Sequence, residues 1–386
     1  MYKLISSFLG VVCLIGFASI TLAQTTNPLL IDLNDNTALD LGKYNCLNPV
    51  GTDYDCTTIV DYSSFTYDSS RHQMLMFGGG HATTFRDDVD VFHFDTLSWQ
   101  RAYIPTPCSE MTASNLDSDR GAWNSTNHPF SRHTYDLLAF ANNTNELIMM
   151  AWGAGAGSGN CEQIKDWYPD GRVAHYDPET KKWVFGASMT NSWEQFASVE
   201  FDPQSGLIVI VDSSSIWTYD PVNKAIKKRV SHNAQNMGYA NNLVYFPPNG
   251  NMYYIARGTT TKVFEVVLDR QNWGNSTVTN LNLSGNVPSS QESGFAFDST
   301  NEIIGGGIRN GNFIAFDPVL KKWNEVPMNL SGGGSNLTQY YHAIDYDPID
   351  NVFIFIGSDK HTWAYRYSKP KSGTPLPPTT LRLNTQ

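Results

Sequence analysis

The chain has 386 residues, of which 41% are apolar, 13% aromatic and 16% charged. Apolar and aromatic residues at this level support a large core rich in strands and exclude an intrinsically disordered chain. The formal net charge of −11 at pH 7 repels phosphate backbones and argues against nucleic acid as a partner.

The N-terminal residues 1–23 have the pattern of a secretory signal peptide. Lys3 supplies the positive start, residues 9–20 form an apolar run, and residues 21–23 offer a cleavage site of small residues. The apolar run is too short for a membrane span, and no other stretch is long enough. We therefore expect a secreted protein, extracellular or periplasmic, with no membrane span.

Four cysteines follow the signal peptide, namely Cys46, Cys56, Cys108 and Cys161. An even number in an oxidising compartment predicts two disulfides, for which three pairings are possible. We favour Cys46–Cys56 together with Cys108–Cys161, because the first pair closes one short loop. A zinc site is the weaker alternative, since the chain has no C-x-x-C motif.

Six N-x-S/T sequons occur, at Asn124, Asn142, Asn275, Asn282, Asn329 and Asn336. In a eukaryotic secretory pathway they predict surface glycosylation. Because the chain is rich in Asn, chance is an equally open explanation.

A pattern of strands recurs six times between residues 62 and 369. Each copy has an apolar strand that often ends in Asp, a turn, a second apolar strand and a small-residue loop. A third strand then ends in an aromatic residue and Asp, often followed by Trp. The copies begin near residues 63, 133, 196, 241, 293 and 341. Asp-Pro and Asn-Gly pairs set tight reversals, and no segment has a sustained helical period.

This repeat predicts an all-β protein, a β-propeller of four-stranded antiparallel blades, with six blades favoured and seven as the alternative. One small sheet cannot bury both faces, whereas radial packing lets each blade cover its neighbours. We expect residues 62–369 to form the propeller and residues 24–61 to close the ring with an outer strand. Residues 370–386 form a Pro-rich extended tail. A closed ring leaves no sheet edge to extend, which favours a monomer.

Glycines and trailing tryptophans mark several copies. Glycine after the second strand fits a crowded turn near the axis, and the Trp fills the space between adjacent blades. The residues are Gly78, Gly79, Phe92 and Trp99 in the first copy, Tyr176 and Trp183 in the second, and Gly305, Gly306, Phe316 and Trp323 in the fifth. In these residues the chain resembles the kelch repeat family. The resemblance implies the propeller fold and no single function, because kelch propellers include enzymes, glycan binders and scaffolds.

Polar and aromatic residues gather at the entry to the innermost strands, whose loops meet around the axis of a propeller. The candidate catalytic residues are His81, Arg132, His133, Tyr135, Tyr341 and His342, and the candidate substrate-binding residues are Trp193, Glu194, Asn236, Tyr239 and Glu292. Aromatic faces stack on sugars, Arg132 would pair with a uronate or sulfate, and a His or Tyr would abstract a proton in a β-elimination. The alternative is that these residues only fill the axis.

These residues predict a secreted propeller that binds a carbohydrate, an acidic polysaccharide or glycan, at its central funnel. If it is an enzyme, a polysaccharide lyase is the first expectation. A non-catalytic recognition or adhesion propeller is the alternative. No cofactor is required by either.

A copper-dependent carbohydrate oxidase is the least favoured alternative. Tyr341-His342 looks like the Tyr-His strand of galactose oxidase, a kelch-type propeller with a copper radical site. That site needs a cysteine crosslinked to a second tyrosine, but here the cysteine position falls at or near Tyr62. Thr134 occupies the tyrosine position and Tyr135 is offset by one residue, which reverses the face of a strand. A plain metal site formed by histidines is possible but has no spacing signature.

Overall fold

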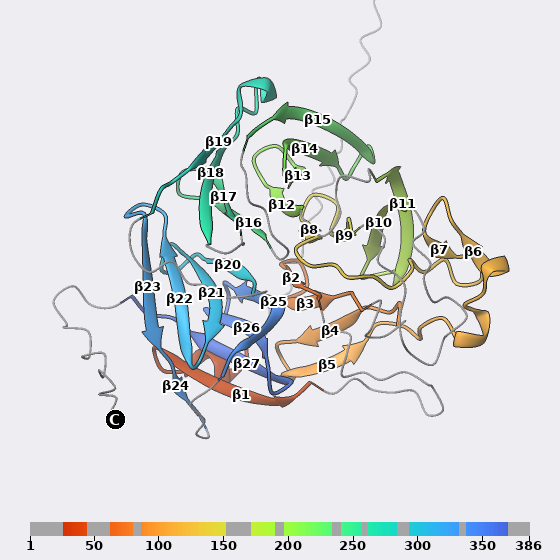
Figure 1. Cartoon of the computed structure of the whole chain (residues 1–386). Coiled ribbons are helices and arrows are strands. Elements are labelled where there is room, and N and C mark those ends of the chain that lie inside the picture. Colours follow the sequence, from red (N-terminus) through yellow and green to blue (C-terminus); the bar gives the residue numbers. More distant parts are fainter. Residues whose placement is uncertain are drawn as a thin grey trace, which may run out of the picture.

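The computed structural model describes residues 26–44, 62–79, 86–151, 171–189, 197–233, 241–256, 261–283, 293–331 and 337–369. Most of the strands form six sheets that radiate from a common axis (Figure 1); five have four antiparallel strands, and the sixth adds a short parallel strand at its outer edge. The prediction of an all-β propeller with six four-stranded blades is confirmed. The α-helix in the described ranges is a single turn, α1 (Pro28–Ile31), and no described helix has the length and apolar character needed to cross a membrane.

The strands of each blade are given from the axis outward. Blade 1 has β2 (Phe65–Asp68), β3 (Gln73–Met76), β4 (Asp90–His93) and β5 (Ser98–Arg101); blade 2 has β8 (Leu138–Ala141), β9 (Glu146–Met149), β10 (Arg172–Asp177) and β11 (Lys182–Ser188). Blade 3 has β12 (Ser198–Asp202), β13 (Leu207–Val211), β14 (Ser215–Asp220) and β15 (Ala225–Ser231); blade 4 has β16 (Asn242–Phe246), β17 (Asn251–Ala256), β18 (Lys262–Val267) and β19 (Thr277–Asn280). Blade 5 has β20 (Phe295–Asp298), β21 (Ile303–Arg309), β22 (Asn312–Asp317) and β23 (Lys322–Pro327).

Blade 6 combines the two ends of the described chain. Its inner strands are β25 (Gln339–Asp347), β26 (Val352–Gly357) and β27 (His361–Arg366). The N-terminal β1 (Thr37–Lys43) pairs antiparallel with β27, with Thr37 opposite Arg366. The short β24 (Asn329–Leu330) then adds in parallel to β1. One sheet therefore holds strands that lie more than three hundred residues apart in the sequence, and this pairing closes the ring.

Aspartates fix the turn that follows many of the strands. Asp68 at the end of β2 accepts the backbone N–H groups of Ser70 and Arg71. Asp298 does the same for Thr300 and Asn301 after β20. A carboxylate that binds the N–H groups two and three residues on stabilises a tight reversal, which explains why the repeat places Asp at this position.

The tryptophans bridge neighbouring blades as expected. Trp99 of blade 1 donates its indole N–H to Thr362 of blade 6, at 2.8 Å. Trp183 of blade 2 packs edge-on against Phe77 of blade 1, with ring centroids 5.1 Å apart. Large aromatic side chains in these positions contribute both apolar burial and specific ring geometry to the contacts between blades.

The segment between β5 and β8 forms a small lobe and not only a loop. It contains the 3-10 helices η2 (Cys108–Glu110) and η3 (Ala113–Asn115) and the two-stranded sheet of β6 (Leu116–Asp117) and β7 (Ala122–Trp123). Met111, Trp123 and Phe130 form its own buried core. Cys46, Cys56 and Cys161 lie outside the described residues, so the disulfide pairing stays a prediction.

Candidate functional site

Three tyrosines occupy the same position at the entry to three adjacent blades. Tyr62, Tyr135 and Tyr341 each stand six residues before the last residue of the innermost strand, in blades 1, 2 and 6. All three have a positive φ, of 58°, 42° and 49°. A bulky residue in this left-handed region is strained, and such strain persists only where the surroundings enforce it.

The rings of these tyrosines meet two histidines. Tyr62 stacks on His133, with ring centroids 4.2 Å apart, and lies 4.5 Å from Tyr341. Tyr135 approaches both Tyr62 and His342, at 5.9 and 6.0 Å. The hydroxyl of Tyr135 lies 3.3 Å from Nδ1 of His133. We call these five residues, Tyr62, His133, Tyr135, Tyr341 and His342, the entry cluster.

Hydrogen bonds between blades hold the strained backbone of the entry cluster. The N–H of Tyr135 donates to the carbonyl of Tyr62 at 2.7 Å. The carbonyl of Tyr341 accepts from Gly294 of blade 5 and from the side chain of Gln339. Thus four predicted site residues from distant parts of the sequence, His133, Tyr135, Tyr341 and His342, lie together. They surround Tyr62, which was not itself predicted as a site residue.

Arg132 does not belong to the entry cluster, although it was predicted to. Its guanidinium donates to the backbone carbonyls of Phe130, Ala151 and Gly121 at 2.9 to 3.0 Å, and the residue is only 1% exposed. Burial lowers the pKa of Arg132 to about 10. The side chain therefore ties the inserted lobe to blade 2, and the structure does not support its expected role as partner of a uronate.

A different cation lies beside the entry cluster. The ammonium group of Lys360, in the turn between β26 and β27, sits 3.0 Å from the centre of the Tyr340 ring. Tyr340 in turn contacts Tyr341, with ring centroids 4.5 Å apart. The sequence alone does not reveal the position of Lys360, because this residue lies in a different turn of blade 6 and only the fold brings it to the Tyr340 ring.

The position of Tyr135 bears on the copper radical alternative. The one-residue offset was expected to turn this ring away from the site, but the positive φ at Tyr135 redirects it toward Tyr62 and His342. The side chain next to it is that of Tyr62, where a thioether cofactor would need a cysteine. The thiol required for that crosslink is thus absent from this position.

Six other predicted site residues lie outside the described part of the chain. They are His81, Trp193, Glu194, Asn236, Tyr239 and Glu292. Their roles stay predictions.

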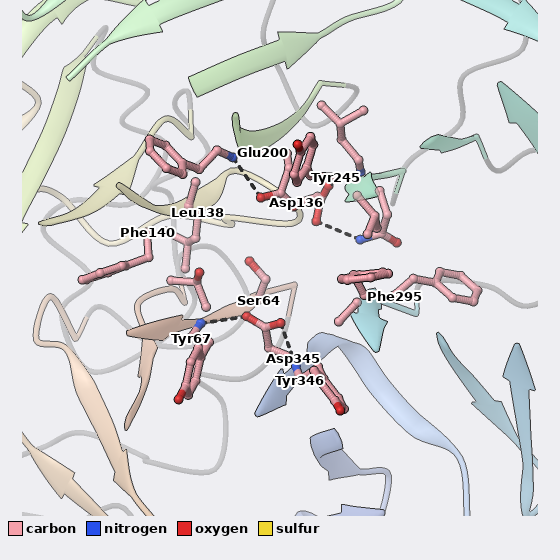
Figure 2. Close-up of a pocket in the computed structure, with 18 of the residues that line it drawn as sticks. Ser64, Tyr67, Asp136, Leu138, Phe140, Glu200, Tyr245, Phe295, Asp345 and Tyr346 are labelled. Atoms are coloured by element: carbon pink, nitrogen blue, oxygen red, sulfur yellow. Dashed lines mark hydrogen bonds between the residues drawn. The ribbon is translucent and has the colours of Figure 1, made fainter. Parts of the chain in front are cut away.

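A cavity of about 370 Å³ runs along the axis below the entry cluster. Residues of all six innermost strands line it, and ten of the lining residues are labelled in Figure 2. His342 of the entry cluster is also among the lining residues. Its far end is bordered by the residue that follows each innermost strand: Ser69, Asn142, Pro203, Pro247, Ser299 and Pro348. The cavity is the central channel of the propeller.

Three carboxylates converge in this channel, as Figure 2 shows for Asp136, Glu200 and Asp345. Each accepts backbone N–H groups from innermost strands. Asp345 binds those of Tyr67 in blade 1 and Tyr346, both at 2.7 Å. The inner edge of a blade has no further strand to pair with, so side-chain oxygens satisfy its donors.

Two of the three channel carboxylates, Asp345 and Glu200, have a pKa above the ordinary value of their residue type. Burial raises the pKa of Asp345 to about 7. Burial, followed by the charges of Asp345 and Asp136, raises the pKa of Glu200 well above its usual range. For Glu200 and Asp345 the only sequence signal is an acid within an otherwise apolar inner strand, as in Val199-Glu200-Phe201.

Comparison with known proteins supports the fold and identifies no function. The chain matches no family model and no curated protein. Among solved structures, it is similar to a structural genomics protein of unknown function from Bacteroides thetaiotaomicron, with 11% identity, a TM-score of 0.52, and coverage of 86% of this chain and 75% of that chain.

Two further solved structures are more distant. An auxiliary nutrient binding protein from the same organism has 9% identity, a TM-score of 0.49, and coverage of 84% of this chain and 75% of that chain. A chain of a nidogen/laminin complex has 10% identity, a TM-score of 0.41, and coverage of 69% and 79%. At 11% identity, the likeness to the structural genomics protein supports the fold alone, and the β-propeller fold hosts many functions.

Proposed function

We propose that the entry cluster is the carbohydrate-binding site of this propeller. The observation that carries the proposal is the recurrence of a strained tyrosine at one position in blades 6, 1 and 2. Packing alone does not require three tyrosines with a positive φ. Such backbone strain is often retained at binding and catalytic sites. Tyr62 and Tyr341 remain partly exposed, and aromatic faces of this kind stack on sugar rings.

Titration of a glycan panel with full-length protein tests this proposal. Tyr341→Asn removes the ring but keeps a residue that tolerates positive φ. Leu97→Asn is the matched control, since Leu97 also has a positive φ, of 51°, in the turn between β4 and β5 of blade 1. We expect Tyr341→Asn to weaken binding at least tenfold, about 1.4 kcal/mol, and Leu97→Asn to leave it unchanged. Equal affinities of both variants and the parent would refute the proposal.

We propose an acidic glycan as the ligand, with Lys360 taking the part first expected of Arg132. The ammonium group at the Tyr340 ring places a positive charge beside the aromatic faces. Lys360→Gln should lower affinity for a uronate-containing oligosaccharide and spare its neutral counterpart. Equal losses for both oligosaccharides would show that the charge has no role in recognition.

β-Elimination is the second candidate function, and the contact between His133 and Tyr135 favours it. In this reaction a base removes the proton from the carbon next to the uronate carboxyl group. The electron pair forms a double bond as the neighbouring bond to the glycosidic oxygen breaks, and that oxygen takes up a proton. Two hydrogen-bonded groups can divide these proton transfers between them.

Ultraviolet absorbance of unsaturated uronates separates cleavage from binding alone. We expect Tyr135→Phe, which keeps the ring, to abolish the absorbance and retain glycan binding. His361→Gln changes an exposed histidine that pairs with Asp40 on the outer strand and should have no effect. Binding without any absorbance change in the parent protein would instead identify a recognition module.

We also propose that the chain is secreted and glycosylated. The five sequon asparagines that the structure describes, Asn124, Asn142, Asn275, Asn282 and Asn329, are all exposed. An N-linked glycan is bulky, so the asparagine that carries it must lie on the surface of the folded protein. Enzymatic removal of N-glycans from protein secreted by a eukaryotic host should reduce its mass, whereas an unchanged mass would rule out their use in that host.

A further inference from the structure

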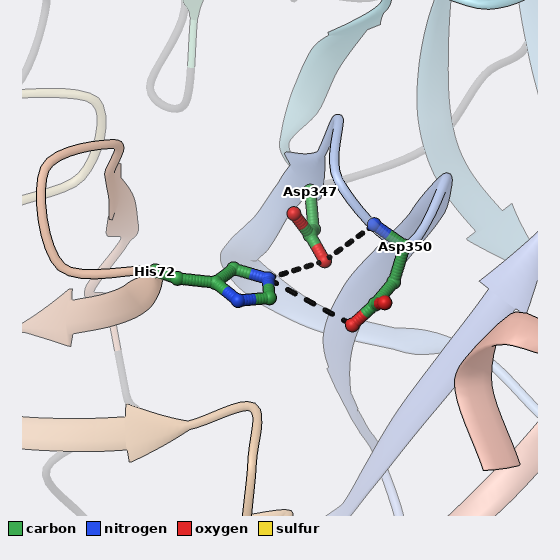
Figure 3. A group of neighbouring side chains, drawn as sticks. All are labelled: His72, Asp347 and Asp350. Atoms are coloured by element: carbon green, nitrogen blue, oxygen red, sulfur yellow. Dashed lines mark hydrogen bonds and ion pairs between the residues drawn. The ribbon is translucent and has the colours of Figure 1, made fainter. Parts of the chain in front are cut away.

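A second cluster of titratable side chains lies at the other end of the innermost strands. His72 is in the turn between β2 and β3 of blade 1, Asp347 ends β25, and Asp350 is in the turn before β26 of blade 6. Figure 3 shows the imidazole of His72 directed toward both carboxylates. The cluster therefore joins the two blades across the seam where the first repeat meets the last.

The donor atoms of the three side chains face one another. Nε2 of His72 lies 3.0 Å from an oxygen of Asp347 and 3.7 Å from an oxygen of Asp350. One ligand atom from each residue falls within 4.8 Å of the others. Ligand atoms bound at about 2.0–2.1 Å in a tetrahedron are separated by about 3.3 Å, so these spacings match a shared ion.

Burial makes the charges of this cluster costly. The side chains are 4%, 0% and 0% exposed for His72, Asp347 and Asp350. Neither oxygen of Asp350 accepts a hydrogen bond of ordinary length and angle from the described residues. Two buried carboxylates beside one imidazole leave an excess of negative charge, which is costly in a buried site.

The imidazole is held in place by its own packing. The ring of His72 stacks on Phe94, with centroids 4.4 Å apart and planes 5° from parallel. Its backbone has a positive φ of 51°. A fixed ring that presents one nitrogen to two carboxylates has the arrangement that metal-binding histidines need.

We propose that His72, Asp347 and Asp350 bind a divalent transition metal ion such as Zn²⁺. Imidazole and carboxylate donors suit this class of ion, and its charge balances the two acids. Since the ligands come from blades 1 and 6, the bound ion would link the two blades independently of the entry cluster. Its role is in stability and not in catalysis.

The test is Zn²⁺ titration of metal-free full-length protein by calorimetry, with thermal unfolding of the same samples. Asp350→Asn keeps the shape of the side chain and removes its charge. His361→Asn is the control, because His361 also pairs with an aspartate but in an exposed position. We expect one Zn²⁺ per chain and a higher midpoint of unfolding when it binds. Asp350→Asn should weaken this binding at least tenfold, and His361→Asn should not change it.

Absence of Zn²⁺ binding, or binding that Asp350→Asn leaves intact, would overturn the proposal and indicate that protons alone balance the cluster. If Asp350→Asn fails to fold, X-ray absorption of the zinc-loaded parent protein decides the question. A shell of light nitrogen or oxygen ligands with the outer-shell scattering of one imidazole would support the site, whereas sulfur ligands or the scattering of several imidazoles would overturn it.

Discussion

At the scale of single residues, the sequence predicted most members of the entry cluster. Tyr135 and Tyr341 were predictable because the repeat places both at the same distance from the end of an innermost strand, and His133 and His342 lie within two residues of them. The position of Arg132 was not predictable. Its guanidinium donates to three carbonyl oxygens, two from the inserted lobe and one from Ala151. Hydrogen bonds made across such sequence distances leave no pattern that a single sequence reveals.

Asp345 should make stability depend on pH. Its pKa is raised to about 7 in the folded protein, against about 3.9 in an unfolded chain. Its contribution to stability is thus complete below about pH 4 and is lost as the pH rises through 7. We expect the free energy of unfolding to fall across this window, and to fall less in Asp345→Asn.

Urea unfolding at pH 5 and pH 8 measures this difference. Glu200 has a raised pKa of its own, so the variant should retain part of the fall. A fall of the same size in the variant and the parent would show that Asp345 does not titrate in this range.

At the scale of the strands, close contacts between neighbouring blades set the distance between their sheets. Gly186 on β11 of blade 2 faces Tyr219 on β14 of blade 3, whose hydroxyl is hydrogen-bonded to the buried His175. The repeat predicted where strands and aromatic wedges occur. It could not predict this contact, because Gly186 has no repeated counterpart and its neighbour is set by the angle between two sheets.

Gly186→Ala should destabilise the protein by about 1–3 kcal/mol. A Cβ at this position would lie within 2.0 Å of the Tyr219 hydroxyl oxygen, so the Tyr219–His175 pair must shift. Gly274→Ala is the control, since its nearest neighbour is 3.5 Å away. Chemical denaturation of both variants checks the prediction, and equal stabilities would mean that the blades adjust freely.

At the scale of the whole molecule, we expect stability to depend on the contacts that join the first and last blades. The fold class and blade number followed from the repeat, since six copies of one pattern leave few architectures. The lateral contacts at the seam did not, because they join segments at opposite ends of the chain. Arg366 on β27 illustrates this: its guanidinium donates to the carbonyls of Leu30, Ile31 and Leu33 near the N-terminus, and to that of Asp350.

Arg366→Lys should lower the free energy of unfolding by about 1–3 kcal/mol, because an ammonium group cannot reach all of these carbonyls. Arg172→Lys serves as control, since the ion pair of Arg172 with Asp119 is exposed and contributes little. Thermal unfolding of both variants tests this. A larger loss for Arg172→Lys would mean that the seam is not the weak point of the ring.

The location of a bound glycan tests the central claim most directly. Tyr62 and Tyr341 at the entry cluster, and Tyr67 and Tyr245 at the far end of the channel, are all partly exposed. Hydroxyl-radical footprinting with and without a saturating oligosaccharide compares them in one experiment. We expect protection of Tyr62 and Tyr341 with no change at Tyr67 and Tyr245; protection confined to the far end, or to neither pair, would contradict the account.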